Sequence, residues 1–255
     1  MASHIVTCNC LRDGRSLDMI DVLQFYQTNF GPVVRFFPIL AILILWFGLV
    51  RAGFSPKART TGLVVTGLLL VWWVASDLLA RSGFYTQHWG VMRPVCWMIA
   101  ILWVIPLMRS ATIGGALDAL PLWLLPLLQV YRAGGGMAWF GLVAAGKIPA
   151  SFGLVVGTGD TLVGILAVVA GVYLYSGARG GRVVAIAWNT FGLLDFAIGN
   201  TVQTFIPISL AYPAVMIPAF FAPLSVDLHA LSLRQLIRAI NRERPTPTLA
   251  NAKIA

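Results

Sequence analysis

The stretch Gln129–Gly171 reads QVYRAGGGMAWFGLVAAGKIPASFGLVVGTGDTLVGILAVVAG, and it contains two long apolar runs joined by the short turn Gly146–Pro149. The first run carries Arg132 and the second carries Asp160, each far from the nearest end of its run. A charge at that depth in hydrocarbon costs at least about 2.5–3.5 kcal/mol, so it persists mainly where it pairs or faces a polar interior. The stretch therefore predicts a membrane bundle built around an internal Arg–Asp site.

The composition of the whole chain indicates the same class of protein. Hydrophobic residues make up 58% of the 255 residues and charged residues 11%, whereas a soluble domain is about a quarter charged. The apolar stretches of about 20 residues are too many and too long for the core helices of a soluble protein. We therefore expect an all-α fold, a polytopic membrane helix bundle.

Seven apolar stretches are long enough to cross about 30 Å of hydrocarbon as helices. Together they predict a seven-helix transmembrane domain over residues 32–233, with short connections that leave no room for an extramembrane domain. The predicted spans are Val33–Val50, Gly62–Ala80, Val91–Met108, Leu120–Ala145, Ala150–Tyr175, Val183–Thr204 and Tyr212–Leu233.

The two ends of the chain have a different pattern. Residues 1–31 contain no apolar region of the signal-peptide kind, so we expect an extramembrane segment and no cleavable signal. Within it, Ser16–Phe30 has an apolar stripe at helical spacing, which predicts an amphipathic helix lying in the membrane interface. In residues 234–255, leucines and isoleucines alternate with arginines and two prolines follow, which predicts a basic cytoplasmic helix and a disordered tail.

The basic residues predict the orientation, because cytoplasmic loops carry an excess of lysine and arginine. With seven spans, the larger group of lysines and arginines lies on the inner side if the N-terminus is outside and the C-terminus inside. That group is Arg51, Lys57, Arg59, Arg109, Arg179, Arg182, Arg234, Arg238, Arg242, Arg244 and Lys253; the outer group is Arg12, Arg15, Arg35, Arg81, Arg93 and Lys147. The net charge of +9 is explained by orientation and by anionic inner-leaflet lipids at the C-terminal helix, so no nucleic acid is expected.

Cysteines and histidines give little support for a metal site. His4, Cys8 and Cys10 are weak candidates, because one Cys-x-Cys pair with one histidine is a poor signature. Cys96 lies in an apolar run and is expected to be a small core residue. No catalytic residue and no cofactor is predicted.

The informative polar residues lie at mid-depth. Arg132, Asp160 and Asp195 come from the fourth, fifth and sixth predicted spans, and Asn189 lies a turn or two toward the inside. If all three charged groups ionise, one negative charge is in excess, and a low dielectric favours protonation of one aspartate. Two carboxylates that share an arginine and a proton suit a proton-coupled process. The alternative is a static salt bridge that fixes the helix register.

A second polar pair lies near the inner end of the seventh predicted span. Asp227 and His229 could form a separate inner-side polar site, although a hydrogen-bonded structural role is favoured for the histidine. Prolines in the fourth and seventh spans predict kinks, and Gly134–Gly136 either brings another helix close or divides the fourth span into two pieces.

Several fragments of the second half resemble a family of bacterial polytopic integral membrane proteins of about seven spans and uncharacterised activity. They are Val130-Tyr-Arg-Ala-Gly134, Gly146-Lys-Ile-Pro149, Gly159-Asp-Thr-Leu-Val-Gly164, Trp188-Asn-Thr-Phe-Gly-Leu-Leu-Asp195, and Ile217-Pro218 followed by Pro223 and Leu228-His229. The resemblance covers residues 125–235 and implies a bacterial inner membrane. It selects Arg132, Asp160, Asn189, Asp195 and His229 among the polar residues.

Seven spans in this orientation also resemble microbial rhodopsins. The lysines are Lys57, Lys147 and Lys253, and none lies in the seventh span, so a retinal Schiff base there is excluded.

Three functions fit these observations. The first is small-molecule or proton/ion transport at the Arg132 site. The second is a non-catalytic membrane subunit or sensor, in a homo-oligomer or a larger complex, whose buried charges organise helix packing. The third is a membrane enzyme acting on a lipid or quinone, which ranks lower because the sequence has no nucleophile–base pair and no metal cluster.

Overall fold

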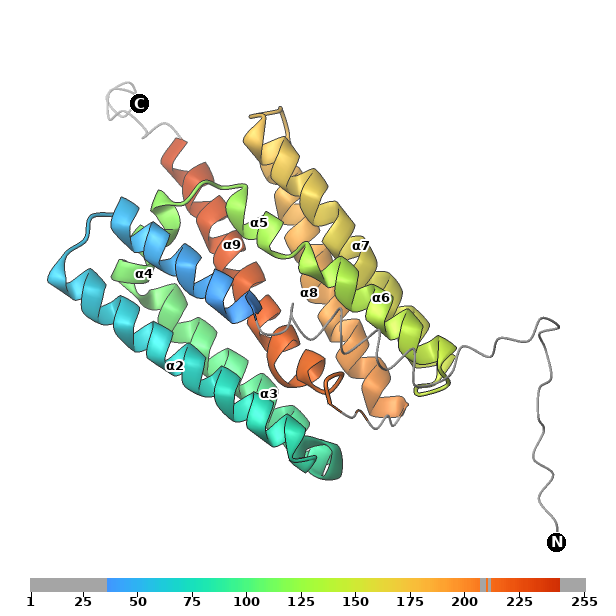
Figure 1. Ribbon diagram of the computed structural model, residues 1–255. Helices are drawn as coiled ribbons and strands as arrows, with labels where there is room; N and C mark the ends of the chain where they lie inside the picture. Colours follow the sequence, from blue (N-terminus) through green and yellow to red (C-terminus); the bar gives the residue numbers. More distant parts are fainter. Residues whose placement is uncertain (1–35, 207–209, 211, 244–255) are drawn as a thin grey trace, which may run out of the picture.

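The computed structural model describes residues 36–206, 210 and 212–243, and these residues form helices and no strand (Figure 1). The expected all-α fold is confirmed for this part of the chain. The predicted interfacial helix within residues 16–30, the metal candidates His4, Cys8 and Cys10, and the predicted tail after Glu243 lie outside the described residues. The helices are Phe36–Arg51, α2 Pro56–Arg81, α3 Phe84–Arg109, α4 Ala111–Ala119, α5 Leu124–Leu128, α6 Tyr131–Ala144, α7 Ala150–Tyr175, α8 Gly181–Phe205, the π-helix η1 Ile217–Phe221 and α9 Ala222–Glu243.

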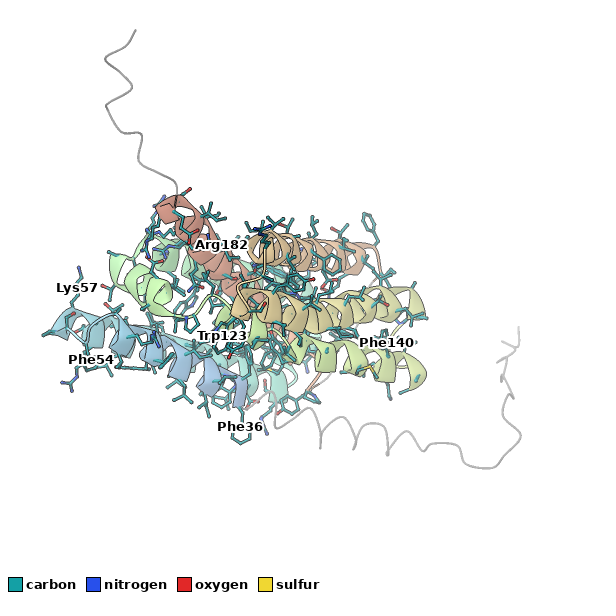
Figure 2. The ribbon with its side chains drawn as sticks, turned by 90° about the horizontal axis from the view of Figure 1, so that it is seen from above. Phe36, Phe54, Lys57, Trp123, Phe140 and Arg182 are labelled. Atoms are coloured by element: carbon teal, nitrogen blue, oxygen red, sulfur yellow. The ribbon has the colours of Figure 1, made fainter. Side chains whose placement is uncertain are left out.

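Four of these helices, α2, α3, α7 and α8, are long and apolar enough to cross a membrane. A fifth candidate is the pair formed by α4 and Leu124–Ala144, which is bent by 93°. The outward faces carry large apolar side chains such as Val71, Leu102 and Val172, and Figure 2 shows Phe36 extending outward from the first helix. Long apolar helices with apolar exteriors are typical of a polytopic membrane protein.

The predicted span Ala150–Tyr175 coincides with α7. Its start is defined by the preceding turn, in which Gly146 adopts a left-handed conformation at φ 64°. There the Lys147 amide donates to the Leu142 carbonyl at 2.9 Å, which is the long hydrogen bond of a Schellman cap. Pro149 then lies directly before α7, where its missing N–H costs nothing. The glycine and the proline act on the backbone next to them, so the start of α7 can be predicted accurately from the sequence.

The fourth predicted span, Leu120–Ala145, is not one continuous helix. Residues 120–123 turn, α5 is a single short helix, and α6 begins only at Tyr131. Pro121 and Pro126 lack the N–H that an α-helix needs, and the amides of Gln129, Val130, Arg132 and Ala133 bond three residues back instead of four. The break therefore follows the prolines, while Gly134–Gly136 lies inside α6.

The seventh predicted span, Tyr212–Leu233, has the wrong limits. Its first residues turn, and helical structure begins with η1 at Ile217, where Pro218 accompanies a π-helical segment. From there α9 continues past Leu233 to Glu243 without a break. The basic segment predicted as a separate helix is thus, as far as Glu243, the last part of α9. A helix break at Leu233 has no physical cause, because no proline or glycine follows until Pro245.

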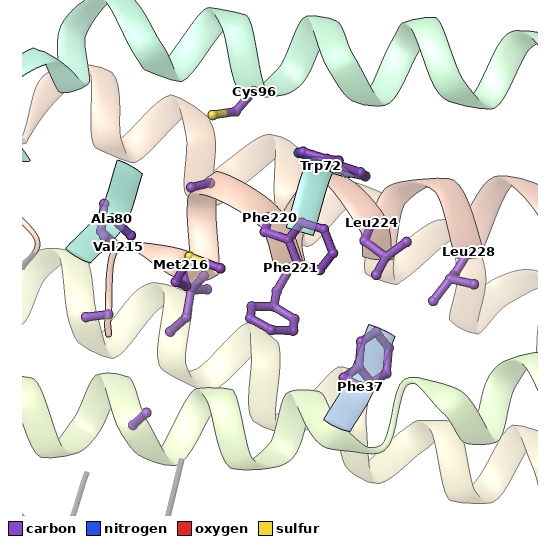
Figure 3. Close-up of a cluster of buried hydrophobic side chains, with 14 of the residues drawn as sticks. Phe37, Trp72, Ala80, Cys96, Val215, Met216, Phe220, Phe221, Leu224 and Leu228 are labelled. Atoms are coloured by element: carbon purple, nitrogen blue, oxygen red, sulfur yellow. The ribbon is translucent and has the colours of Figure 1, made fainter. Parts of the chain in front are cut away.

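The helix α9 lies in the middle of the bundle, against α3, α8, α4 and α5 (Figure 1). Figure 3 shows the apolar core that its first turns share with η1 and with the helices on one side, where Trp72 packs against Phe220 with ring centroids 4.7 Å apart. Phe37, Leu224 and Leu228 belong to the same cluster. Cys96 is buried in it, as predicted.

The packing of α6 on α7 depends on one missing side chain. A Cβ at Gly164 would collide with the backbone of Ala133 at the start of α6, whereas a Cβ at the neighbouring helical residue Gly134 would meet open space. We expect Gly164→Ala to reduce the free energy of unfolding by about 1–3 kcal/mol, because the two helices must move apart. Gly134→Ala, the matched control, is expected to be neutral or to stabilise by up to about 1 kcal/mol. Equilibrium unfolding in mixed micelles measures both; equal effects would contradict the close approach.

Candidate functional site

The centre of the site is the guanidinium of Arg132, in the first turn of α6. Its Nε donates to Oδ1 of Asp160 at 2.8 Å, and its Nη2 lies 2.7 Å from the same oxygen. Nη2 also donates a short hydrogen bond to Oδ2 of Asp195. The three side chains come from α6, α7 and α8, and their residues are only 2%, 7% and 8% exposed. One guanidinium therefore pairs with two buried carboxylates.

Aromatic side chains enclose this ion pair. The indole Nε1 of Trp139 donates to the second oxygen of Asp160 at 2.9 Å, so both oxygens of that carboxylate are bonded. The ring of Phe196 lies against the guanidinium, with its centroid 3.9 Å from Cζ of Arg132, which is a cation–π contact. These contacts hold the buried charges in place.

His229 joins the site from α9, and its hydrogen bonds determine its tautomer. The amide of Asn189 donates from Nδ2 to the Ala185 carbonyl and to Oγ of Ser232, at 2.8 and 3.1 Å. Its Oδ1 is therefore an acceptor for Nδ1 of His229, 2.9 Å away, so Nδ1 carries the proton. The remaining nitrogen, Nε2, faces Nη1 of Arg132 at 3.3 Å and accepts from it. A neutral imidazole thus binds the third nitrogen of the guanidinium.

Two glycines make room for these side chains on α7 and α8. A Cβ at Gly159 would overlap the carboxylate of Asp195, and a Cβ at Gly192 would overlap the ring of His229. Any larger residue at either position would push a charged or polar partner away from Arg132. The glycines are therefore part of the site, although they carry no polar side chain.

A cavity with a mainly apolar wall and four polar side chains lies next to the two carboxylates. It has a volume of about 50 Å³ and is lined by Asp160, Asp195, Asn200 and Gln203 together with aromatic and aliphatic residues. A cavity needs about 10–15 Å³ to hold one water, so this one has room for several. Oδ1 of Asn200 and Nε2 of Gln203 are buried and have no hydrogen-bond partner among the described residues. Such groups are expected to bind water.

The structure brings together five of the residues that the sequence singled out: Arg132, Asp160, Asp195, Asn189 and His229. The predicted inner-side pair does not form one site, because Asp227 lines a different, apolar cavity. His229 lies near the middle of the helical segment Ile217–Glu243 and not near its end, because the predicted span ended too early, at Leu233.

Some residues of the site were missed by the sequence analysis. Trp139 lies seven residues after Arg132, two turns along the same face of α6, and this spacing is a signal that could have selected it. No comparable spacing in the sequence identifies Ser232 or Phe196 as residues of the site. Among the residues that the structure describes, no group of three or more His, Cys, Asp or Glu side chains could hold a metal ion.

Comparison with known proteins identifies a family but no relative of known activity. The family model described as "Domain of unknown function (DUF8737)" matches residues 84–237, which is more than half of the chain. The chain belongs to this family, and the matched range contains every residue of the Arg132 site. No curated protein and no solved structure matches the chain.

The buried charges give a testable prediction for stability. We expect Arg132→Gln to reduce the free energy of unfolding by about 3–5 kcal/mol, because two buried carboxylates lose their cation. Adding Asp160→Asn and Asp195→Asn to that variant should restore most of the loss, since no uncompensated charge then remains. Arg81→Gln, which breaks the half-exposed pair with Asp77, should change stability by less than about 1 kcal/mol. Denaturant unfolding in micelles measures all three; a triple variant no more stable than Arg132→Gln would contradict this explanation.

Proposed function

We propose that this protein is a small transporter or proton-linked channel, and that Arg132, Asp160 and Asp195 form its proton-carrying site. The observation that carries the proposal is that two buried carboxylates share one guanidinium beside a cavity large enough for water. With both carboxylates ionised and His229 neutral, the site has one excess negative charge. Because an uncompensated charge is costly away from water, binding of one proton or one monovalent cation stabilises the site.

Polar groups on both sides of the ion pair support this role. On one side, toward the end of α8, the cavity with Asn200 and Gln203 has room for water beside the carboxylates. On the other side, the hydrogen bonds continue from Arg132 through His229 and Asn189 to Ser232. A proton or ion therefore meets polar groups in succession along α8 and α9.

The interrupted helix around Arg132 also favours transport. Between α5 and α6 the backbone bonds three residues back, and Arg132 follows this break directly. Helices that are interrupted near the middle of the membrane line the binding sites of many secondary transporters, because their half-helix ends and unwound backbone supply polar groups for the substrate or ion. The chain offers no internal repeat, so the proposal rests on the site and not on a transporter fold.

We further propose seven crossings of a bacterial inner membrane, with the N-terminus outside and the C-terminus inside. The first helix, α2, α3, the bent α4 with Leu124–Ala144, α7, α8 and η1–α9 run back and forth between two ends of the bundle in Figure 1. The central helix α9 is too polar to be recognised by its hydropathy, but its neighbours shield it from lipid. Arginines gather at the end where α9 terminates, which supports the orientation.

Anionic lipids are the proposed partners of that arginine-rich end. Arg238 and Arg242 pair with Asp118, and Arg182 pairs with Glu243. The side chains of Arg238 and Arg242 are 48% and 62% exposed, so they remain open to headgroups, whereas Arg234 is buried and donates from Nε to the Met108 carbonyl. Basic groups at this position attract anionic headgroups, each contributing about 1 kcal/mol near the surface.

Proton flux tests the proposed site. We expect purified protein in vesicles that contain a trapped pH-sensitive dye to show proton flux driven by a potassium diffusion potential. Asp160→Asn and Asp195→Asn should abolish the flux while the protein still folds, because each removes the excess negative charge. The control is Asp118→Asn, which removes a carboxylate at the arginine-rich end of the bundle. Flux that is unchanged in both site variants would remove the proposal.

Labelling of single cysteines tests the orientation. In a chain with its native cysteines replaced by serine, Lys147→Cys in the α6–α7 turn should react with an impermeant maleimide in intact cells. Arg179→Cys in the α7–α8 turn, which is also exposed, should react only after the membrane is permeabilised. The opposite pattern would reverse the orientation, and equal labelling of both sites would contradict the crossing of α7.

A second function, a non-catalytic subunit or sensor, is favoured by a different observation. All three guanidinium nitrogens of Arg132 make hydrogen bonds, and both carboxylate oxygens of Asp160 accept one. A network this complete also suits a static centre that fixes the positions of four helices. Wild-type vesicles without proton flux, together with site variants of reduced stability, would favour this function.

A further inference from the structure

A second cavity lies between α9 and the first half of the bundle, away from the Arg132 site. Its volume is about 100 Å³, which is of the same order as the ~150 Å³ apolar cavity that binds benzene in an engineered protein. The walls come from the first helix, α2, α3, α4, α5 and α9. Nearly all of them are leucine, isoleucine, valine, alanine and tryptophan side chains.

Asp227 is the exception among these lining residues. It is 3% exposed, and its Oδ1 is buried with no hydrogen-bond partner among the described residues. No basic side chain lines the cavity. An ionised carboxylate in such surroundings requires a cation, and a protonated one would leave its O–H without an acceptor. The cavity therefore has a polar group that the described part of the chain does not satisfy.

Two tryptophans indicate which kind of ligand would satisfy it. Trp72 and Trp103 both line the cavity, with their rings stacked and their centroids 6.3 Å apart. The faces of indole rings attract cations. A carboxylate and two indole rings around a small apolar space thus suit a cationic group attached to an apolar body. Nε1 of Trp72 is also buried without a hydrogen-bond partner among the described residues, but a neutral acceptor bonded to it would leave the carboxylate of Asp227 without a cation.

We propose that this cavity binds a small lipophilic amine, whose ammonium group pairs with Asp227 and whose apolar part packs among the leucines and tryptophans. The volume limits the apolar part to about one aromatic ring or a short alkyl chain. Asp227 is here a binding residue and not a catalytic one. The inference does not depend on transport at Arg132, because the two sites share only the helix α9.

Benzylamine is a suitable probe, and benzyl alcohol is its neutral counterpart of nearly the same shape. We expect the full chain in nanodiscs to bind benzylamine saturably, as measured by quenching of tryptophan fluorescence and by a rise in Tm. Benzyl alcohol should bind at least about tenfold more weakly, because it cannot form the ion pair. Asp227→Asn should remove this advantage of the amine and leave alcohol binding unchanged. Asp77→Asn, which removes a carboxylate from a half-exposed pair, should leave both affinities as they are.

A second variant keeps the proposal testable if Asp227→Asn does not fold. Ile44→Phe fills part of the cavity and retains the carboxylate, so it should weaken both probes at least about tenfold by excluding the ring. Benzylamine binding that survives Ile44→Phe would locate the amine elsewhere and overturn the proposal. Equal binding of the amine and the alcohol to the wild type, or no saturable binding of the amine, would overturn it as well.

Discussion

The contact of one guanidinium with two carboxylates is the constraint on which the packing of this bundle depends. Removing a charge from water costs several kcal/mol, and the attraction between opposite charges repays that cost only in a good geometry. Arg132 therefore fixes the depth and the rotation of α6 relative to α7 and α8, because Asp160 and Asp195 must both reach it. His229 binds the remaining nitrogen and extends the same constraint to α9. Four helices are held in register by one side chain.

Close contact between backbones is what makes this geometry accessible. Side chains as short as those of aspartate can meet an arginine on another helix only if the helices approach closely, and small residues permit that approach. Gly164 allows α7 to touch the beginning of α6, Gly159 leaves space for the carboxylate of Asp195, and Gly192 leaves space for the ring of His229. The polar centre therefore depends on the glycines. With larger residues at these positions of α7 and α8, Asp195 and His229 could not lie against Arg132.

Much of this arrangement could be predicted from the sequence, and the errors have a common origin. The span Ala150–Tyr175 was correct because turn residues mark both of its ends. The meeting of Arg132 with Asp160 could be expected because a deeply buried charge requires a partner. His229 was predicted near the end of its span because that span was ended at Leu233, whereas the observed helical segment runs from Ile217 to Glu243 and has the histidine near its middle. The prolines of the fourth span predicted a kink, but the break before Tyr131 was not located, because apolar content does not report backbone hydrogen bonding.

The helix α9 shows why hydropathy identifies some helices of a bundle and not others. Hydropathy measures suitability for contact with lipid, and α9 is surrounded by α3, α4, α5 and α8. Its sequence is free to carry Asp227, His229, Ser232 and Gln235, all of them buried. At 100° per residue, Asp227 and His229 lie about 200° apart around the helix, so they face different neighbours. One face completes the Arg132 centre, and the other supplies the carboxylate of the apolar cavity. A rotation or a shift of α9 would therefore move His229 relative to Arg132 and Asp227 relative to the apolar cavity at the same time. This shielded helix is thus the element that connects the two sites.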